Sequence, residues 1–313
     1  MSDQRTFLTT TPAGLDHELL PMKLWQKAKR LGIWNPVDID FTEDREHWAR
    51  LEEVEKQALL HLTSLFQAGE ESVVIDLLPL ISVVAKERRL EEEIYLTSFL
   101  WEEAKHVEVF RRFLDEVAED RSDLARFHSH NYRRLFYEAL PQDLLALWGD
   151  TSPPALARAS VTYNMIVEGV LAETGYHAYY QMLSRNRIMP GMQKAVRNLQ
   201  SDEARHLAYG VYLLSRLIAA HGDPVWDTID RRMNQLVPVA LGIIQDVFSA
   251  YEVMPFGLEL DEFSGFALTQ FQKRFARLEK ARGADVDEVE RAAPYEELPE
   301  VALGLETPLT AGS

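Results

Sequence analysis

Two copies of a short motif have the residue types and spacing to bind metal ions. Glu103 and His106 form the first E-x-x-H pair, and Glu203 and His206 form the second. Both pairs lie in stretches with the apolar periodicity of a helix, and residues three apart share one face of a helix. Each copy therefore offers a carboxylate and an imidazole that point in the same direction.

Two further glutamates extend this set. Glu70 and Glu168 each stand alone on an otherwise apolar helical stripe, about one helix and a turn before an E-x-x-H pair. A single E-x-x-H pair is commonly a solvated acid beside an ordinary histidine. Burying four unpaired carboxylates would, however, cost several kcal/mol for each. We therefore interpret the six residues as the ligands of a dimetal site in which four helices take part.

The chemistry of this ligand set narrows the choice of metal. Four carboxylates balance the charge of two divalent cations, so the site can be buried. The sequence has no cysteine, which argues against a structural zinc site, and the histidines argue against calcium or magnesium. Iron or manganese is the expected metal.

Four long helices must position these ligands. The apolar periodicity predicts them at about 44–78, 88–120, 154–184 and 191–220, with other helices at 23–30, 132–139, 225–252 and 261–282. Strand and hairpin signals are scarce. We expect an all-α fold with a four-helix bundle core and additional helices. Residues 1–285 would form one domain with an N-terminal arm, and residues 286–313 a flexible tail.

Composition disfavours several other functions. The net charge of −17 disfavours nucleic acid as a partner, because phosphate binding needs a basic surface. The absence of cysteine excludes disulfides, thiolate-bound clusters and thiol catalysis. The N-terminal residues lack the pattern of a secretory signal, and no apolar stretch is long enough to span a bilayer. We expect a cytoplasmic protein.

The motifs and their neighbours resemble a known family. Residues 69–73 (GEESV), 102–106 (EEAKH), 163–169 (YNMIVEG) and 202–206 (DEARH) are similar to motifs of ferritin-like dimetal carboxylate proteins. More narrowly, they resemble the small subunit of class I ribonucleotide reductase and its side branch of ligand-binding oxidases. Trp34 resembles a tryptophan near the metals of that family, and Asp202 an acid that orients a ligand histidine. The likeness covers about residues 20–285.

The resemblance implies a specific chemistry. Members assemble a mixed manganese–iron centre, activate dioxygen and hold a long-chain fatty acid whose carboxylate reaches the metals. They also join a valine to a tyrosine through an ether bond, and the matching residues here are Val73 and Tyr163. Ala172, Gly175 and Tyr176, on the third long helix, are expected at the fatty-acid pocket. A homodimer is expected as well.

One position separates this chain from tyrosyl-radical subunits. Those subunits carry a tyrosine four residues after the first motif's histidine, where this chain has Phe110, and Tyr295 lies far from the C-terminus for a radical-relay residue. Some manganese–iron reductase subunits also lack that tyrosine, so Phe110 alone does not separate the two branches. The presence of both Val73 and Tyr163 favours the oxidase. The alternatives are a manganese–iron reductase small subunit and a fatty-acid monooxygenase. Iron storage is less favoured, because storage proteins have shorter bundles.

Overall fold

Helices joined by short connections make up the structure. The computed structural model describes residues 7–291, and that part of the chain contains helices and no strand. The α-helices are α1 (Leu20–Leu31), α2 (Thr42–Arg50), α3 (Glu53–Asp76), α4 (Leu78–Lys86), α5 (Leu90–Phe113), α6 (His130–Arg133), α7 (Leu140–Leu145), α8 (Pro153–Ser160), α9 (Glu173–Tyr179), α10 (Pro190–His221), α11 (Asp223–Ser249), α12 (Leu260–Lys280) and α13 (Val286–Arg291). The π-helical segments are η3 (Leu114–Ala118), η5 (Arg134–Ala139), η7 (Val161–Ala172) and η8 (Tyr180–Ser184), and the 3-10 turns are η1 (Leu8–Thr10), η2 (Pro36–Asp38), η4 (Leu124–Phe127), η6 (Ala146–Trp148) and η9 (Pro255–Gly257). The predicted all-α fold is confirmed.

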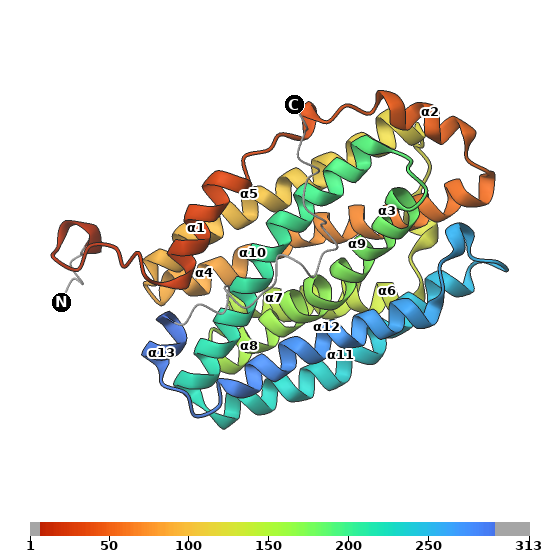
Figure 1. The fold of residues 1–313 in the computed structure, drawn as a ribbon. Coiled ribbons are helices and arrows are strands. Elements are labelled where there is room, and N and C mark those ends of the chain that lie inside the picture. The colour runs from red at the N-terminus through yellow and green to blue at the C-terminus, as the bar shows by residue number, and fades with distance from the viewer. Residues whose placement is uncertain (1–6, 292–313) are drawn as a thin grey trace, which may run out of the picture.

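Four helical rods form the core of the molecule (Figure 1). Three are α3, α5 and α10, and the fourth is the continuous rod of α8, η7 and α9. α3 packs against α5, and η7 packs against α10. α11 and α12 pack against η7, while α1 lies against α5 and α10. The four-helix core with additional helices thus matches the expected architecture.

A capping box and a proline divide the first predicted helix. Glu52 and Glu55 each accept a hydrogen bond from the other's backbone N–H, which starts α3 separately from α2. Pro79 has no N–H to donate to a preceding turn, so it lies in the first turn of a new helix, α4. The predicted helix at 44–78 is therefore α2 and α3, and α4 was not predicted.

The third rod departs from a regular α-helix at its centre. In η7 the backbone hydrogen bonds run from residue i to residue i+5. This wider turn brings residues five apart closer to the same face than an α-helix does, and Tyr163 and Glu168 have that spacing. Arg274, from α12, donates to the Gly169 carbonyl at 2.5 Å. The sequence predicts a helix here but not its widened turns.

Two predicted boundaries differ from the structure. The sequence places the end of a short helix after residue 139, whereas α6, η5 and α7 run on, because Pro141 lies in the first turn of α7. A short helix, α13, also follows residue 285, and its Glu290 pairs with Arg89 at 2.6 Å. The rest of the predicted tail, with Tyr295, lies outside the described residues.

No helix within residues 7–291 has the length and hydropathy to cross a membrane.

Candidate metal centre

All the predicted ligands converge inside the four-helix core. Glu70 comes from α3, Glu103 and His106 from α5, Glu168 from η7, and Glu203 and His206 from α10. Each is at most 6 % exposed. They form two sets that share Glu103 and Glu203, one completed by Glu70 and His106 and the other by Glu168 and His206. Within each set the ligand atoms lie within 4.8 Å of one another.

His106 directs its Nδ1 atom at the first set of carboxylates. That atom lies 3.5 Å from a Glu70 oxygen. It lies 3.4 Å from oxygens of Glu103 and of Glu203. No hydrogen bond satisfies the buried nitrogen. The three oxygens and the nitrogen therefore surround a position that a metal ion would fill.

His206 does the same in the second set. Its Nδ1 atom lies 2.9 Å from Glu103, 3.4 Å from Glu203 and 3.9 Å from Glu168. This nitrogen, one oxygen of Glu168 and one of Glu203 are buried without a hydrogen-bond partner. Buried polar atoms are rarely left unsatisfied. The donor set of carboxylates and imidazoles fits two iron or manganese ions, which would satisfy these atoms.

A further carboxylate contacts the other nitrogen of each ligand histidine. Asp202 Oδ2 lies 3.4 Å from His106 Nε2, and Glu102 Oε2 lies 2.9 Å from His206 Nε2. Such contacts fix the orientation of the ring and leave Nδ1 facing the carboxylates that would hold a metal. The sequence identifies Asp202 but not Glu102. The Glu102 contact crosses from α5 to α10, so no spacing along the chain reports it.

Arg205 links these two outer carboxylates and was also missed. Its Nη2 atom donates to Glu102 at 2.6 Å and to Asp202 at 2.5 Å, and the side chain is fully buried. Gly32 packs directly against this cluster, since a Cβ atom there would lie 2.1 Å from Glu102 Oε1. One guanidinium therefore connects the carboxylates that orient both ligand histidines.

Trp34 lies at the edge of the same cluster. Its Nε1 atom donates to Asp202 Oδ2 at 2.8 Å, and its ring runs nearly parallel to His106 with 6.3 Å between centroids. Lys105 Nζ donates to the same Asp202 oxygen at 3.0 Å and to the Gly32 carbonyl at 2.6 Å. Trp34 is thus linked to the candidate ligand His106 through Asp202, which both side chains contact.

Burial and crowding alter the proton affinities of the ligands. Burial raises the pKa of Glu70 to about 8 and raises the pKa of Glu168 well above its ordinary value. Burial also disfavours ionised Glu103, but His206 and His106 outweigh it and hold the pKa of Glu103 below its ordinary range. Burial lowers the pKa of His106 and His206, but the surrounding carboxylates outweigh it and raise both pKa values above the ordinary range. Metal ions would have to displace these protons.

Two tyrosines donate to ligand carboxylates. The Tyr163 hydroxyl donates to Glu103 Oε1 at 3.1 Å. The Tyr176 hydroxyl lies 3.3 Å from Glu203 Oε1 and 3.4 Å from Glu70 Oε1. Tyr176, expected at a lipid pocket, thus directs its hydroxyl at the metal ligands. A buried phenol needs an acceptor, and the carboxylates provide one.

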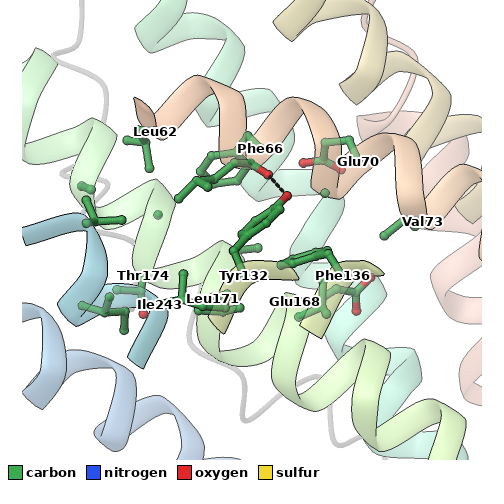
Figure 2. Close-up of a pocket in the computed structure, with 18 of the residues that line it drawn as sticks. Leu62, Phe66, Glu70, Val73, Tyr132, Phe136, Glu168, Leu171, Thr174 and Ile243 are labelled. Carbon is green, nitrogen blue, oxygen red and sulfur yellow. Dashed lines mark hydrogen bonds between the residues drawn. The ribbon is translucent and has the colours of Figure 1, made fainter. Parts of the chain in front are cut away.

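An apolar cavity opens beside the ligands (Figure 2). Its empty volume is about 820 Å³, part of which is open to solvent. Val73, Ala172 and Gly175 line it, with Glu70 and Glu168 among the carboxylates at its polar end. The other walls are mostly apolar side chains such as Leu62, Phe66, Phe136, Leu171, Ile243 and Phe263. None of the residues that line the cavity is basic.

Comparisons with known proteins identify the family. The family described as ribonucleotide reductase, small chain, matches residues 21–279. The chain belongs to the ribonucleotide reductase small-chain family. The R2-like ligand-binding oxidase from Sulfolobus acidocaldarius is 40 % identical, with a TM-score of 0.84 over 91 % of this chain and 99 % of that one. An R2-like ligand-binding oxidase with aerobically reconstituted Mn/Fe cofactor is 36 % identical, with a TM-score of 0.83 over 88 % and 97 % of the two chains.

The comparisons with the small-chain family agree with the fold that positions the site. Membership and the likeness to these structures confirm the predicted ferritin-like fold and the predicted resemblance to ligand-binding oxidases. A variant R2-like ligand-binding oxidase with anaerobically reconstituted Mn/Fe cofactor is also 37 % identical, with a TM-score of 0.82 over 88 % of this chain and 98 % of that one. Solved relatives of this small-chain protein therefore carry manganese and iron.

Phe110 lies four residues after His106, on the same helix. Its buried ring lies 5.1 Å from the ring of Phe66 and 6.1 Å from that of Tyr179. There is no hydroxyl here to lose a proton. Within residues 7–291, the phenols in hydrogen-bond contact with candidate metal ligands are those of Tyr163 and Tyr176.

Proposed function

We propose that this protein is an oxidase that activates dioxygen at a mixed manganese–iron site, binds a long-chain fatty acid and joins Val73 to Tyr163 through an ether bond. The observation that carries the proposal is the placement of the ligands. Two buried sets share Glu103 and Glu203 and open onto an apolar cavity with Val73 in its wall. Bound manganese and iron would supply the oxidising power when dioxygen reacts.

Val73 and Tyr163 approach the ligands from two different rods. Val73 follows Glu70 by three residues and so lies on the same face of α3. Tyr163 donates to Glu103, and burial raises the pKa of Tyr163 well above its ordinary value, so its proton leaves only to a positioned acceptor. The ether bond joins Tyr163 Oη to Val73 Cβ. Two protons and two electrons leave the pair, and dioxygen accepts them.

The charge distribution around the cavity supports a carboxylate ligand bound to metal. Glu70, Glu103, Glu168 and Glu203 all reach the polar end of the cavity, and no basic residue lines it. An anionic head group would be repelled there unless metal ions neutralise the carboxylates. The apolar walls suit a hydrocarbon chain. A fatty acid bound with its carboxylate on the metals and its chain along these walls satisfies both conditions.

Intact mass and peptide mapping test the cross-link. Protein loaded with manganese and iron under air should be lighter than anaerobically loaded protein by two hydrogens, and peptides containing Val73 and Tyr163 should be joined. Tyr163→Phe should retain both metals and yield separate peptides. Separate peptides from fully metallated, air-exposed wild-type protein would refute the cross-link.

Organic extraction tests the lipid. Mass spectrometry of the extract should identify a long-chain fatty acid from protein with a full dimetal site. Extracts of Glu168→Ala should contain much less, since the head group loses its metal. A clean extract from metal-loaded wild type would rule the ligand out.

The second candidate is a manganese–iron small subunit of ribonucleotide reductase, which the family match supports. It would need a large subunit, so binding to that subunit with recovery of nucleotide reduction would favour it. A fatty-acid monooxygenase would instead release hydroxylated fatty acid in multiple turnovers with an electron donor. The oxidase proposal includes a homodimer, whose mass light scattering would measure. The same measurement would reveal the large particles of a storage protein.

A further inference from the structure

A buried tyrosine outside the ligand set donates its hydroxyl hydrogen to a buried carboxylate. Tyr209 lies on α10, three residues after His206, and is 1 % exposed. Its hydroxyl donates to Glu92 Oε2, on α5, at 3.0 Å. Glu92 is also buried, at 1 % exposed. Neither side chain is a metal ligand, and neither has a part in the proposed cross-link.

Aromatic rings connect Tyr209 to the metal centre. Phe99 stacks on the ligand His206, with 3.6 Å between ring centroids and 10° between planes. The same Phe99 ring lies 5.9 Å from Tyr163 and 6.5 Å from Tyr209. Tyr95 lies 6.1 Å from Phe99 and 5.2 Å from Tyr209. One ring therefore separates a ligand histidine from Tyr209, at ordinary aromatic contact distances.

The hydroxyl partners distinguish Tyr209 from the other tyrosines near the centre. A phenol that loses an electron becomes a strong acid, so its oxidation requires a nearby base for the proton. Tyr163 and Tyr176 donate to metal-ligand carboxylates, where a proton would compete with the metal. The buried Tyr95 hydroxyl has no hydrogen-bond partner. Tyr209 donates instead to a carboxylate that is free of the metal site, which the Tyr212 hydroxyl also contacts, at 3.5 Å.

An ion-pair cluster surrounds the acceptor and extends toward the surface. Glu92 pairs with Arg89 and, at 3.3 Å, with Arg216. Arg216 also pairs with Glu87 at 3.1 Å, and Arg89 with Glu290 of α13 at 2.6 Å. The Arg89 side chain is 25 % exposed. A proton that reaches Glu92 thus enters a network of charged groups, in contact with solvent, on the side away from the ligands.

We propose that Tyr209 is a redox-active tyrosine that reduces the metal centre through Phe99 and His206 when the cross-link cannot form. The electron passes to the oxidised metals, and the Tyr209 proton passes along its hydrogen bond to Glu92. The inference rests on the proposed dioxygen chemistry. Tyr209 would thus reduce an oxidised metal centre that cannot take electrons from the Val73–Tyr163 pair.

The electron balance defines when Tyr209 reacts. Reduction of dioxygen to two waters takes four electrons. Bound manganese and iron would supply two by going from divalent to trivalent, and the cross-link would supply the other two. Without the Tyr163 hydroxyl those last two are missing. Tyr209 then supplies one and is left as a neutral tyrosyl radical, while excess ferrous ion in the loading mixture supplies the other.

Electron paramagnetic resonance of Tyr163→Phe protein tests this inference. The variant is loaded with manganese and excess ferrous iron, exposed to air and frozen at successive times. A tyrosyl signal is expected, and ring-deuterated tyrosine should narrow it. The signal should be lost in Tyr163→Phe/Tyr209→Phe. It should persist in Tyr163→Phe/Tyr179→Phe, a matched control because Tyr179 is equally buried and contacts Phe110 on another side of the core.

Each outcome bears on the proposal. A signal that persists without the Tyr209 hydroxyl, or no signal in Tyr163→Phe protein that consumes dioxygen, overturns it. Glu92→Gln, which removes the charged acceptor but keeps its shape, should also suppress the signal at equal metal content, and serves if the Tyr209 variant fails to fold. Failure of the proposed function is seen separately, as wild-type protein that consumes no dioxygen and keeps its mass.

Discussion

Arg205 offers a test of how the two halves of the centre are held together. Arg205→Met removes the guanidinium that pairs with both Glu102 and Asp202; Asp202 keeps its pair with Lys105, whereas buried Glu102 loses its arginine partner. Removing one partner of a buried ion pair costs about 3–5 kcal/mol. In a chain of this size each kcal/mol lowers Tm by about 2 °C, so the fall should be roughly 6–10 °C. Because these carboxylates orient both ligand histidines, metal affinity should fall about 10–100-fold.

Differential scanning calorimetry and metal titration measure these effects. Arg111→Met is the matched control, since it breaks an exposed pair with Asp115 and should cost less than about 1 kcal/mol. Adding Glu102→Gln to Arg205→Met removes the carboxylate charge that has lost its arginine partner and should restore part of the Tm. An Arg205→Met protein with unchanged Tm and metal affinity would refute the bridging role.

Three further predictions concern the ligands, the cavity and pH. Glu168→Ala should lower the metal content measured by elemental analysis, and two metals at full occupancy would exclude Glu168 as a ligand. Gly175→Ala should destabilise the fold by about 1–3 kcal/mol, because the new Cβ would lie 2.5 Å from the packed Phe66 ring. Gly265→Ala, in open space on α12, is the control and should be neutral or stabilising. Equal denaturation midpoints for the two variants would contradict this. With its pKa raised to about 8, Glu70 is mostly protonated at neutral pH without metal, and burial raises the pKa of Glu168 in the same direction. Metal binding should therefore release protons and weaken as pH falls below about 8, and a titration in weak buffer without proton release would contradict this.

Local spacing was sufficient to find the candidate ligands that the fold brings together. Glu103 and His106 are three apart on one helix, so their shared direction follows from helix geometry alone. Glu70 and Glu168 were recognisable because an apolar stripe surrounds each. The same periodicity gave the four long rods. These features depend on residues close in the chain, which a single sequence records.

Contacts between different helices cannot be derived from the spacing of residues along one helix. Glu102 lies next to a ligand but points toward His206 of α10, and Arg205 reaches from α10 to α5. Tyr176 follows Gly175 directly, and neighbouring residues on a helix point about 100° apart, so one lines the cavity while the other faces the ligands. The π-helical turns of η7 had no sequence signal that we recognised.

Metal content measured together with intact mass tests the central claim most directly. The protein is purified without metal, loaded with manganese and iron, and divided between anaerobic and aerated samples. We expect one manganese and one iron per chain in both samples, and a mass lower by two hydrogens in the aerated one alone. Two bound metals with identical masses before and after air would contradict the proposed cross-linking oxidase, and a chain that binds no metal would contradict the dimetal centre itself.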